Sequence, residues 1–358
     1  MCKKMLFLLF VAITCCKNVV ANNYAILVSA GKATTDGIDF NSDYWYDLYL
    51  VYEYLLLWEN YDSTNVIVFY GDGTDFNTSV NRYKKSLHNW GQITDYDNSY
   101  NTMSSVIASL DNVITENDNL LFYWVSGHGN KNTSNDDSYY VAINYYPNMP
   151  NNPDIEYVSK TELVDMVNSI THYNKRKIFW MTCKSGAMGS GSINLNNNKT
   201  VILTSCQEDY DSSMIHDNDG LSHSAFNYAL YCVSTGINPC NQIPINLNNT
   251  SPYLQNNSDS LISIYELFWG MVGFHYYTYY SLYPDFFDTG NIVSSTFIGE
   301  EKEMKNVSID SNSSYWLDEL EISDVDFDSN INVKIDIDER CIIKKNTIVP
   351  VGTTLLIE

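Results

Sequence analysis

The chain has 358 residues, with 43 acidic against 20 basic side chains and a formal net charge of −23 at pH 7. Such a surface repels phosphate backbones, which excludes nucleic acid as an expected partner. The apolar fraction of 44% and the aromatic fraction of 14% are ample for a packed core, and the length suits one large domain plus a smaller one.

Residues 1–21 have the pattern of a secretory signal peptide. Lys3 and Lys4 precede an apolar stretch over residues 5–13, and Val19-Val20-Ala21 follows at the expected cleavage site. The apolar stretch is too short for a bilayer, so we expect an exported protein without a stable membrane span, secreted, at a surface or in a lysosome-like compartment. The alternative is a buried N-terminal strand. Removing the segment takes away three lysines, which changes the net charge from −23 to about −26.

Cysteine usage gives the first indication of chemistry. Five cysteines follow the signal segment: Cys183, Cys206, Cys232, Cys240 and Cys341. Cys232 and Cys240 flank a Gly-Ile-Asn-Pro turn and are candidates for a disulfide in an oxidising compartment. An odd number leaves at least one thiol free.

Apolar strand patterns alternate with amphipathic helix patterns through residues 22–236. We predict strands over 24–30, 66–70, 120–125, 177–182 and 201–205, and helices over 44–59, 103–114, 160–170 and 222–235. Polar loops are expected over 32–43 and 130–156, the latter with a short strand at 139–143, and Ser159 and Glu162 form a capping box. This alternation is typical of a mainly parallel sheet covered on both faces.

The pattern changes after residue 236. Residues 237–290 are predicted to be a linker and helical extension, with a helix over 261–274, and residues 291–358 a small all-β region. Its strands are expected at 307–309, 320–322, 331–337, 342–343 and 354–357. The role of this region stays open.

Two of the predicted strands end in reactive side chains. Ser126-Gly127-His128-Gly129 follows the strand over 120–125, and Cys183-Lys184-Ser185-Gly186 follows the strand over 177–182. In parallel α/β sheets the ligand site lies at the carboxyl ends of the strands. Each motif alone is common, since strand-end cysteines usually serve packing and Gly-His-Gly is often a structural turn. Their conjunction favours a nucleophile, Cys183, activated by an imidazole, His128.

The pair suits acyl transfer. His128 serves as general base and then as acid to the leaving amine, and the backbone N–H groups of Gly129 and Cys183 are candidate oxyanion donors. A metal site is disfavoured because no third and fourth ligand follows at short spacing. No cofactor is expected, and the substrate would be a protein or peptide.

The His-Gly and Cys-x-Ser-Gly-x-Met motifs resemble those of the legumain-type cysteine peptidases, within the wider caspase-like fold. The resemblance spans residues 24–235 and implies a caspase-like three-layer sandwich with a mainly parallel sheet. Residues 240–358 do not resemble the helical prodomain of animal and plant legumains.

The resemblance also suggests positions for substrate recognition. The family's Asn-Tyr-Arg-His motif corresponds here to Asn41-Ser42-Asp43-Tyr44, so Asn41 would orient the catalytic histidine while Asp43 stands where the family has its pocket arginine. The pocket glutamate of the family corresponds to Met181. We therefore expect a preference for a basic or small polar residue rather than asparagine. Further candidates for the pocket lining are Ser205, Cys206, Glu208 and Asp209, which are otherwise loop residues.

The leading hypothesis is a secreted cysteine endopeptidase that works through a thioester. Two alternatives stay open: a transpeptidase or ligase of the same family, and a non-catalytic secreted adhesion or binding protein. The sequence does not indicate the oligomeric state.

Overall fold

The computed structural model describes residues 21–31, 40–76, 90–143, 155–216, 222–237, 263–264, 267–272 and 284–290. Side chains at 40–43, 216 and 222 lie outside that description. Beyond residue 303 the backbone of six strands is described.

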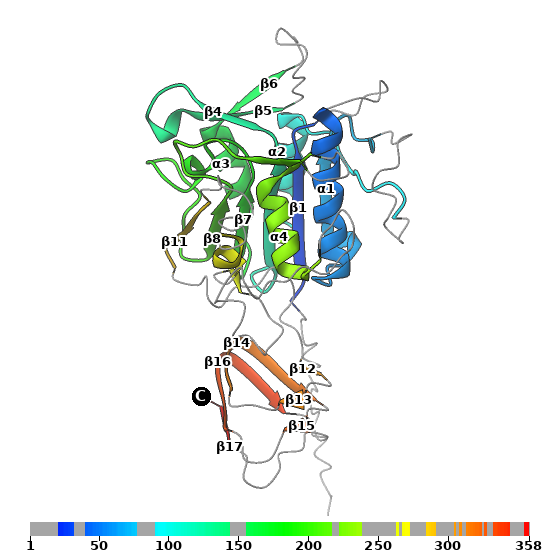
Figure 1. The fold of residues 1–358 in the computed structure, drawn as a ribbon, viewed down its shortest axis with the longest axis vertical. Helices are drawn as coiled ribbons and strands as arrows, with labels where there is room; N and C mark the ends of the chain where they lie inside the picture. Colours follow the sequence, from blue (N-terminus) through cyan, green and yellow to red (C-terminus); the bar gives the residue numbers. More distant parts are fainter. Residues whose placement is uncertain are drawn as a thin grey trace, which may run out of the picture.

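A six-stranded sheet forms the centre of the described fold (Figure 1). Its strands in chain order are β1 (Asn23–Ser29), β2 (Val66–Tyr70), β3 (Asn119–Ser126), β7 (Arg176–Trp180), β8 (Thr200–Thr204) and β11 (Asp285–Asp288). In space the order is β2-β1-β3-β7-β8-β11; the first five run parallel, and β11 is antiparallel to β8. The five strands predicted from apolar runs are confirmed.

Both faces of this sheet are buried. Successive side chains of a strand point to opposite faces, so in β3 Leu121 and Tyr123 belong to one apolar core, whereas Phe122 and Trp124 belong to the other. Burial on both sides explains why these strands read as continuous apolar runs.

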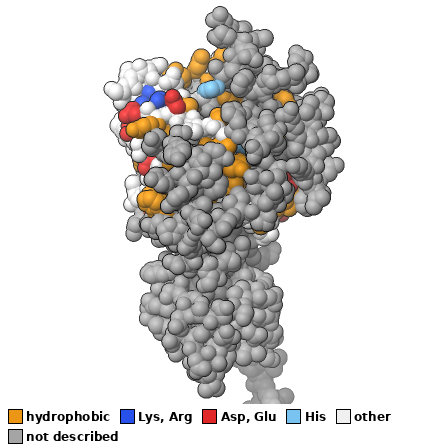
Figure 2. Space-filling view, viewed as in Figure 1, with side chains coloured by type: hydrophobic (Ala, Val, Ile, Leu, Met, Phe, Trp, Pro, Cys, Tyr) orange, Lys and Arg blue, Asp and Glu red, His pale blue; other side chains and the backbone are white. Residues whose placement is uncertain are grey.

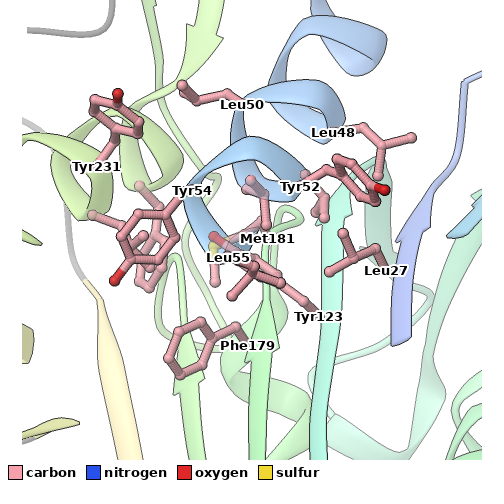
Figure 3. Packing of buried hydrophobic residues seen from close by; sticks show 14 of the residues in the cluster. Leu27, Leu48, Leu50, Tyr52, Tyr54, Leu55, Tyr123, Phe179, Met181 and Tyr231 are labelled. Carbon is pink, nitrogen blue, oxygen red and sulfur yellow. The ribbon is translucent and has the colours of Figure 1, made fainter. Parts of the chain in front are cut away.

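Helices cover both faces of the sheet (Figure 1). They are α1 (Phe40–Leu57) and α4 (Ala225–Thr235) on one face, and α2 (Tyr100–Leu110) and α3 (Lys160–Asn168) on the other. Figure 3 shows the first core, where Leu55 of α1 lies near Phe179 of β7 and Tyr231 of α4 lies near Tyr54 of α1. The structure confirms the three-layer α/β sandwich with a mainly parallel sheet.

Helix α1 begins four residues before the predicted start, at Phe40. The polar residues Asn41, Ser42 and Asp43 were expected in a loop because they are weak formers of helix interiors. They occupy the first turn, where polar and acidic side chains are favoured by the unpaired N–H groups and the helix dipole.

The other helices also differ from the prediction at their ends. Helix α2 ends at Leu110 rather than at residue 114, and α4 begins at Ala225 because the preceding residues form strand β10 (Ser222–Ser224), paired with β9 (Met214–His216). The capping box before α3 is present: Ser159 Oγ accepts from the N–H of Glu162, and a Glu162 carboxylate oxygen accepts from the N–H of Ser159.

A second, three-stranded antiparallel sheet lies beside the ends of β3 and β7 (Figure 1). It consists of β4 (His128–Lys131), β5 (Tyr139–Ile143) and β6 (Glu156–Ser159). Strand β5 matches its predicted range, whereas β4 and β6 were expected to be loop. The sequence of β4 gives little indication of a strand because β4 is short and polar.

The stretch expected to be a linker takes part in the sheet and in the core. Besides β11, Ile264, Leu267, Phe268 and Met271 are buried in the core beneath α1 and α4, and residues 267–272 are helical, within the helix predicted over 261–274. Cys232 is buried in α4, while Cys240 lies outside the described residues.

Strands also occur near the C-terminus, as expected. They are β12 (Met304–Lys305), β13 (Ser308–Ile309), β14 (Ser313–Ser323), β15 (Asp326–Phe327), β16 (Asn332–Ile343) and β17 (Thr354–Ile357). Two of them, β14 and β16, are longer than predicted and pair in parallel. Among the described residues, no helix is long and apolar enough to cross a membrane.

Candidate active site

The two motifs converge because the strands that carry them are neighbours. Strands β3 and β7 pair in parallel, with Trp124 opposite Trp180, so their carboxyl ends lie side by side. Just beyond, the N–H of Met181 donates to the carbonyl of Trp124 at 2.9 Å. His128 and Cys183 therefore emerge from the same end of the sheet.

Gly129 brings the two segments into direct contact. A Cβ atom at this position would lie 2.7 Å from Thr182 Oγ1 and 2.8 Å from the Tyr139 hydroxyl, and closer still to the carbonyl oxygen of Cys183. No side chain fits there. The backbone next to His128 thus packs on the backbone of Cys183.

The Cys183 thiol is partly exposed, and it lies 3.4 Å from Ser212 Oγ. The next residue, Lys184, has a left-handed backbone with φ of 60° and starts the 3-10 helix Ser185–Met188. Within the described part of the chain, the N–H of Cys183 donates no hydrogen bond. A partly exposed thiol suits a nucleophile, and an N–H that makes no hydrogen bond within the described residues is available as an oxyanion donor.

The turn at Cys183 is fixed to the segment 205–212. The N–H of Lys184 donates to the carbonyl of Tyr210 at 2.8 Å, and that of Gly186 donates to the carbonyl of Cys206 at 2.8 Å. Ser185 Oγ also accepts from the N–H of Cys206 at 3.2 Å. These bonds hold Ser212 beside the thiol.

Cys206 differs from Cys183 in its surroundings. It is fully buried, and burial raises the pKa of its thiol, although bonds from Ser185 oppose the rise. A buried thiol with a raised pKa is a poor nucleophile. Of the two cysteines at this end of the sheet, Cys183 is the reactive candidate.

The His128 side chain is exposed at the surface, at the start of β4. Its ring lies 6.1 Å from that of Tyr44 on α1, in an edge-to-face arrangement. The surrounding protein nonetheless removes enough water to lower the pKa of the imidazole from its ordinary 6.5. A neutral imidazole is the form that accepts a proton from a thiol.

Charged residues lie around the site. Lys131 Nζ is 2.8 Å from Asp136 Oδ1 and 2.9 Å from Asp209 Oδ1. Lys184 Nζ donates to the carbonyl of Asp209 at 2.8 Å and lies 3.2 Å from Asp211 Oδ1. Figure 2 shows basic and acidic side chains side by side on one face of the molecule. Through Asp209, these contacts connect Lys131 on the strand of His128 to Lys184, the residue after Cys183.

The structure places the pocket candidates differently. Met181 is buried in the core below α1, next to Leu55 in Figure 3. Ser205 is buried and donates to the carbonyl of Thr182 at 3.0 Å. Asp209 lies at the surface, bound to Lys131. Position 43 is in the first turn of α1, but its side chain lies outside the described residues.

Asn41, expected to orient the histidine, also lies in that first turn, and its side chain is likewise not described. Residue 44 on the same helix does reach His128. The sequence did not indicate a role in the site for Tyr44, Ser212, Thr182 or Tyr139. Tyr44 and Thr182 adjoin candidate residues, whereas Ser212 and Tyr139 come close only through the fold.

Among the described residues, no group of three His, Cys, Asp or Glu side chains is arranged to hold a metal ion.

Comparison with known proteins finds similarity only to solved structures. No protein-family model and no curated protein matches the chain. Among solved structures the chain is similar to caspase-1 from Spodoptera frugiperda, with a TM-score of 0.42 and 10% sequence identity, over 79% of this chain and 91% of that chain. A likeness at this level identifies no family, so function must be inferred from the residues of the site.

Proposed function

We propose that the protein is a cysteine endopeptidase of the legumain type, with Cys183 as nucleophile and His128 as general base and acid. The observation that carries the proposal is the close packing of Gly129 on the Cys183 backbone. It brings an exposed imidazole and a partly exposed thiol to one end of a parallel sheet.

The reaction follows from these two groups. His128 takes the thiol proton while Cys183 Sγ attacks the carbonyl carbon of the substrate. The oxyanion is stabilised by the N–H groups of Cys183 and Gly129. The C–N bond then breaks, His128 gives its proton to the leaving amine, and water hydrolyses the thioester.

Substrate choice in this proposal depends on acidic side chains. Asp43 stands where the family has an arginine, and Asp209 lies at the surface beside the Cys183 turn. We therefore propose a basic or small polar residue N-terminal to the cleaved bond. A panel of fluorogenic peptides that differ at that residue measures this directly; preference for Asn contradicts it.

The test of the enzyme itself is covalent labelling with an electrophilic peptide probe, followed by peptide mass mapping. Wild type should carry the probe on Cys183, and His128→Ala should label far more slowly. His172→Ala is the matched control, since His172 is an exposed histidine beside Asp111. If wild type and His128→Ala are labelled at the same rate, His128 does not activate Cys183 and the proposed dyad is wrong. If Cys183 does not react with the probe at all, the proposal of a cysteine peptidase is wrong.

Product analysis separates hydrolysis from ligation. With a labelled amine nucleophile present, a peptidase releases the free acid, whereas a transpeptidase transfers the acyl group to the amine. We further propose that the protein is exported after removal of residues 1–21. The intact mass of the secreted protein tests this, because a chain that retains residue 1 contradicts it.

A further inference from the structure

A chain of buried hydroxyl groups ends on the backbone of Cys183. The Tyr139 hydroxyl lies 2.9 Å from Trp180 Nε1 and 2.5 Å from Thr182 Oγ1, and Thr182 Oγ1 lies 3.2 Å from the carbonyl oxygen of Cys183. Trp180 and Thr182 are fully buried and Tyr139 is almost so. These residues come from β5, β7 and the turn after β7.

The direction of every bond in this chain is fixed. An indole N–H only donates, so the Tyr139 oxygen accepts from Trp180. The carbonyl oxygen of Cys183 only accepts, so Thr182 gives its one hydrogen to that oxygen. Thr182 Oγ1 must then accept the single hydroxyl hydrogen of Tyr139. Burial raises the pKa of the Tyr139 hydroxyl, so this hydrogen stays in place across the working pH range.

The same atoms form the contact surface for the histidine strand. Gly129 packs on the Tyr139 hydroxyl, on Thr182 Oγ1 and on the carbonyl of Cys183. The hydroxyl chain therefore occupies the space between the backbone that follows His128 and the backbone of the nucleophile. Its geometry sets the separation of the two.

The peptide group after the nucleophile is held at both ends. Its carbonyl oxygen, on Cys183, accepts from Thr182, and its N–H, on Lys184, donates to the carbonyl of Tyr210 at 2.8 Å. Lys184 has a left-handed backbone that a side chain disfavours. A turn of this kind persists only where its surroundings determine it.

We propose that Tyr139 and Thr182 are positioning residues that hold the Cys183 turn against the His128 strand. The proposal rests on the proposed peptidase function and deepens it. Neither residue touches the substrate; both act through the backbone of Cys183. Displacing a reacting group by about 1 Å costs on the order of a hundredfold in rate.

The experiment removes one link at a time in the full-length protein. Tyr139→Phe deletes only the hydroxyl, and Thr182→Val deletes the other hydroxyl at similar volume. Thr182→Ser keeps the link. Tyr140→Phe is the matched control, because Tyr140 is the next residue on β5 and packs on the Tyr157 ring instead.

Three quantities are measured for each variant: kcat and KM on a peptide substrate, the pH profile of iodoacetamide alkylation of Cys183, and the thermal midpoint. Tyr139→Phe and Thr182→Val should each lower kcat by about tenfold to a hundredfold with little change in KM. Both variants should also change the pH dependence of Cys183 alkylation by iodoacetamide. The double variant should be little worse than either single one, because the hydroxyls act in series. Thr182→Ser and Tyr140→Phe should resemble wild type.

The outcomes separate positioning from stability alone. If Tyr139→Phe keeps the kcat and alkylation profile of wild type while its thermal midpoint falls, the proposal is wrong. If Tyr139→Phe does not fold, Thr182→Val decides by the same readouts. If the wild-type protein shows no turnover of the peptide substrate, the proposed peptidase function is wrong. A changed pH profile of Cys183 alkylation in Tyr139→Phe would still support the positioning role.

Discussion

Asp47 and His223 are 176 positions apart in the chain, yet Asp47 Oδ1 lies 3.0 Å from His223 Nδ1 and neither side chain is exposed. The other oxygen of Asp47 accepts from the N–H of Ser224 at 2.8 Å. This pair ties helix α1, which carries Tyr44, to the start of α4. The position of α1 beside His128 thus depends on a buried polar contact.

Replacing Asp47 by Ala should lower the free energy of unfolding by about 1 to 3 kcal/mol, because it removes the acceptor of the hydrogen bonds from His223 Nδ1 and from the N–H of Ser224. The midpoint of urea denaturation measures this. Asp165→Ala, at an exposed position on α3, is the control and should stay within about 0.5 kcal/mol of wild type. Equal midpoints for the two variants contradict the prediction.

Gly129→Ala should reduce stability by about 1 to 3 kcal/mol through overpacking and should abolish turnover, since the methyl group collides with the Cys183 carbonyl. Activity and thermal midpoint are measured together. Gly91→Ala is the comparison: φ is +71° there and nothing lies within 4 Å of the added atom. It should cost only backbone strain of about 1 kcal/mol and leave turnover intact. An active Gly129→Ala enzyme would contradict the packing.

Ser212→Ala should slow alkylation of Cys183 at neutral pH by about tenfold, because the Ser212 hydroxyl lies within reach of the thiol sulfur and a hydrogen bond to a charged group contributes about 1.5 to 3 kcal/mol. Iodoacetamide labelling followed by mass spectrometry gives the rate. Ser105→Ala, on the exposed side of α2, serves as control. An unchanged rate in Ser212→Ala means that the contact does not stabilise the thiolate.

The imidazole of His128 should titrate with a midpoint below pH 6.5. Loss of solvation disfavours the protonated ring and lowers its pKa, so the neutral form persists to lower pH in the folded protein than in the unfolded chain. NMR titration of Cys183→Ala isolates the imidazole from the thiol, with the urea-denatured protein as reference. A folded midpoint at or above that of the reference refutes the shift.

The sequence predicted those features that depend on chain order and apolar pattern. His128 and Cys183 were assigned to the same end of the sheet because both follow apolar strands of a parallel arrangement. The polar strand β4 and the first turn of α1 were missed, since their residues carry no periodic apolar signal. Tyr139 and Ser212 could not be linked to Cys183, because such contacts depend on side-chain directions set by the complete fold.

The buried position of Met181 was predictable from the sequence, because strand alternation indicates it. Alternation along β7 puts Phe179 and Met181 on the same side, toward the core under α1. Its alignment with a pocket residue of the family suggested a place in the substrate site. The strand period favours the interior, where the structure has it.

Strand β11 has a consequence for any shortened form of the protein. All five residues of β8 are buried, and β11 pairs with it through Asp285 to Asp288, while Phe287 packs directly on Gly189 in the loop after Cys183. A fragment that stops at Thr235 would present β8 as a bare apolar edge with unpaired N–H and C=O groups, which invites strand addition from other copies. Such a fragment should aggregate, whereas one that continues through Gly290 keeps that edge closed.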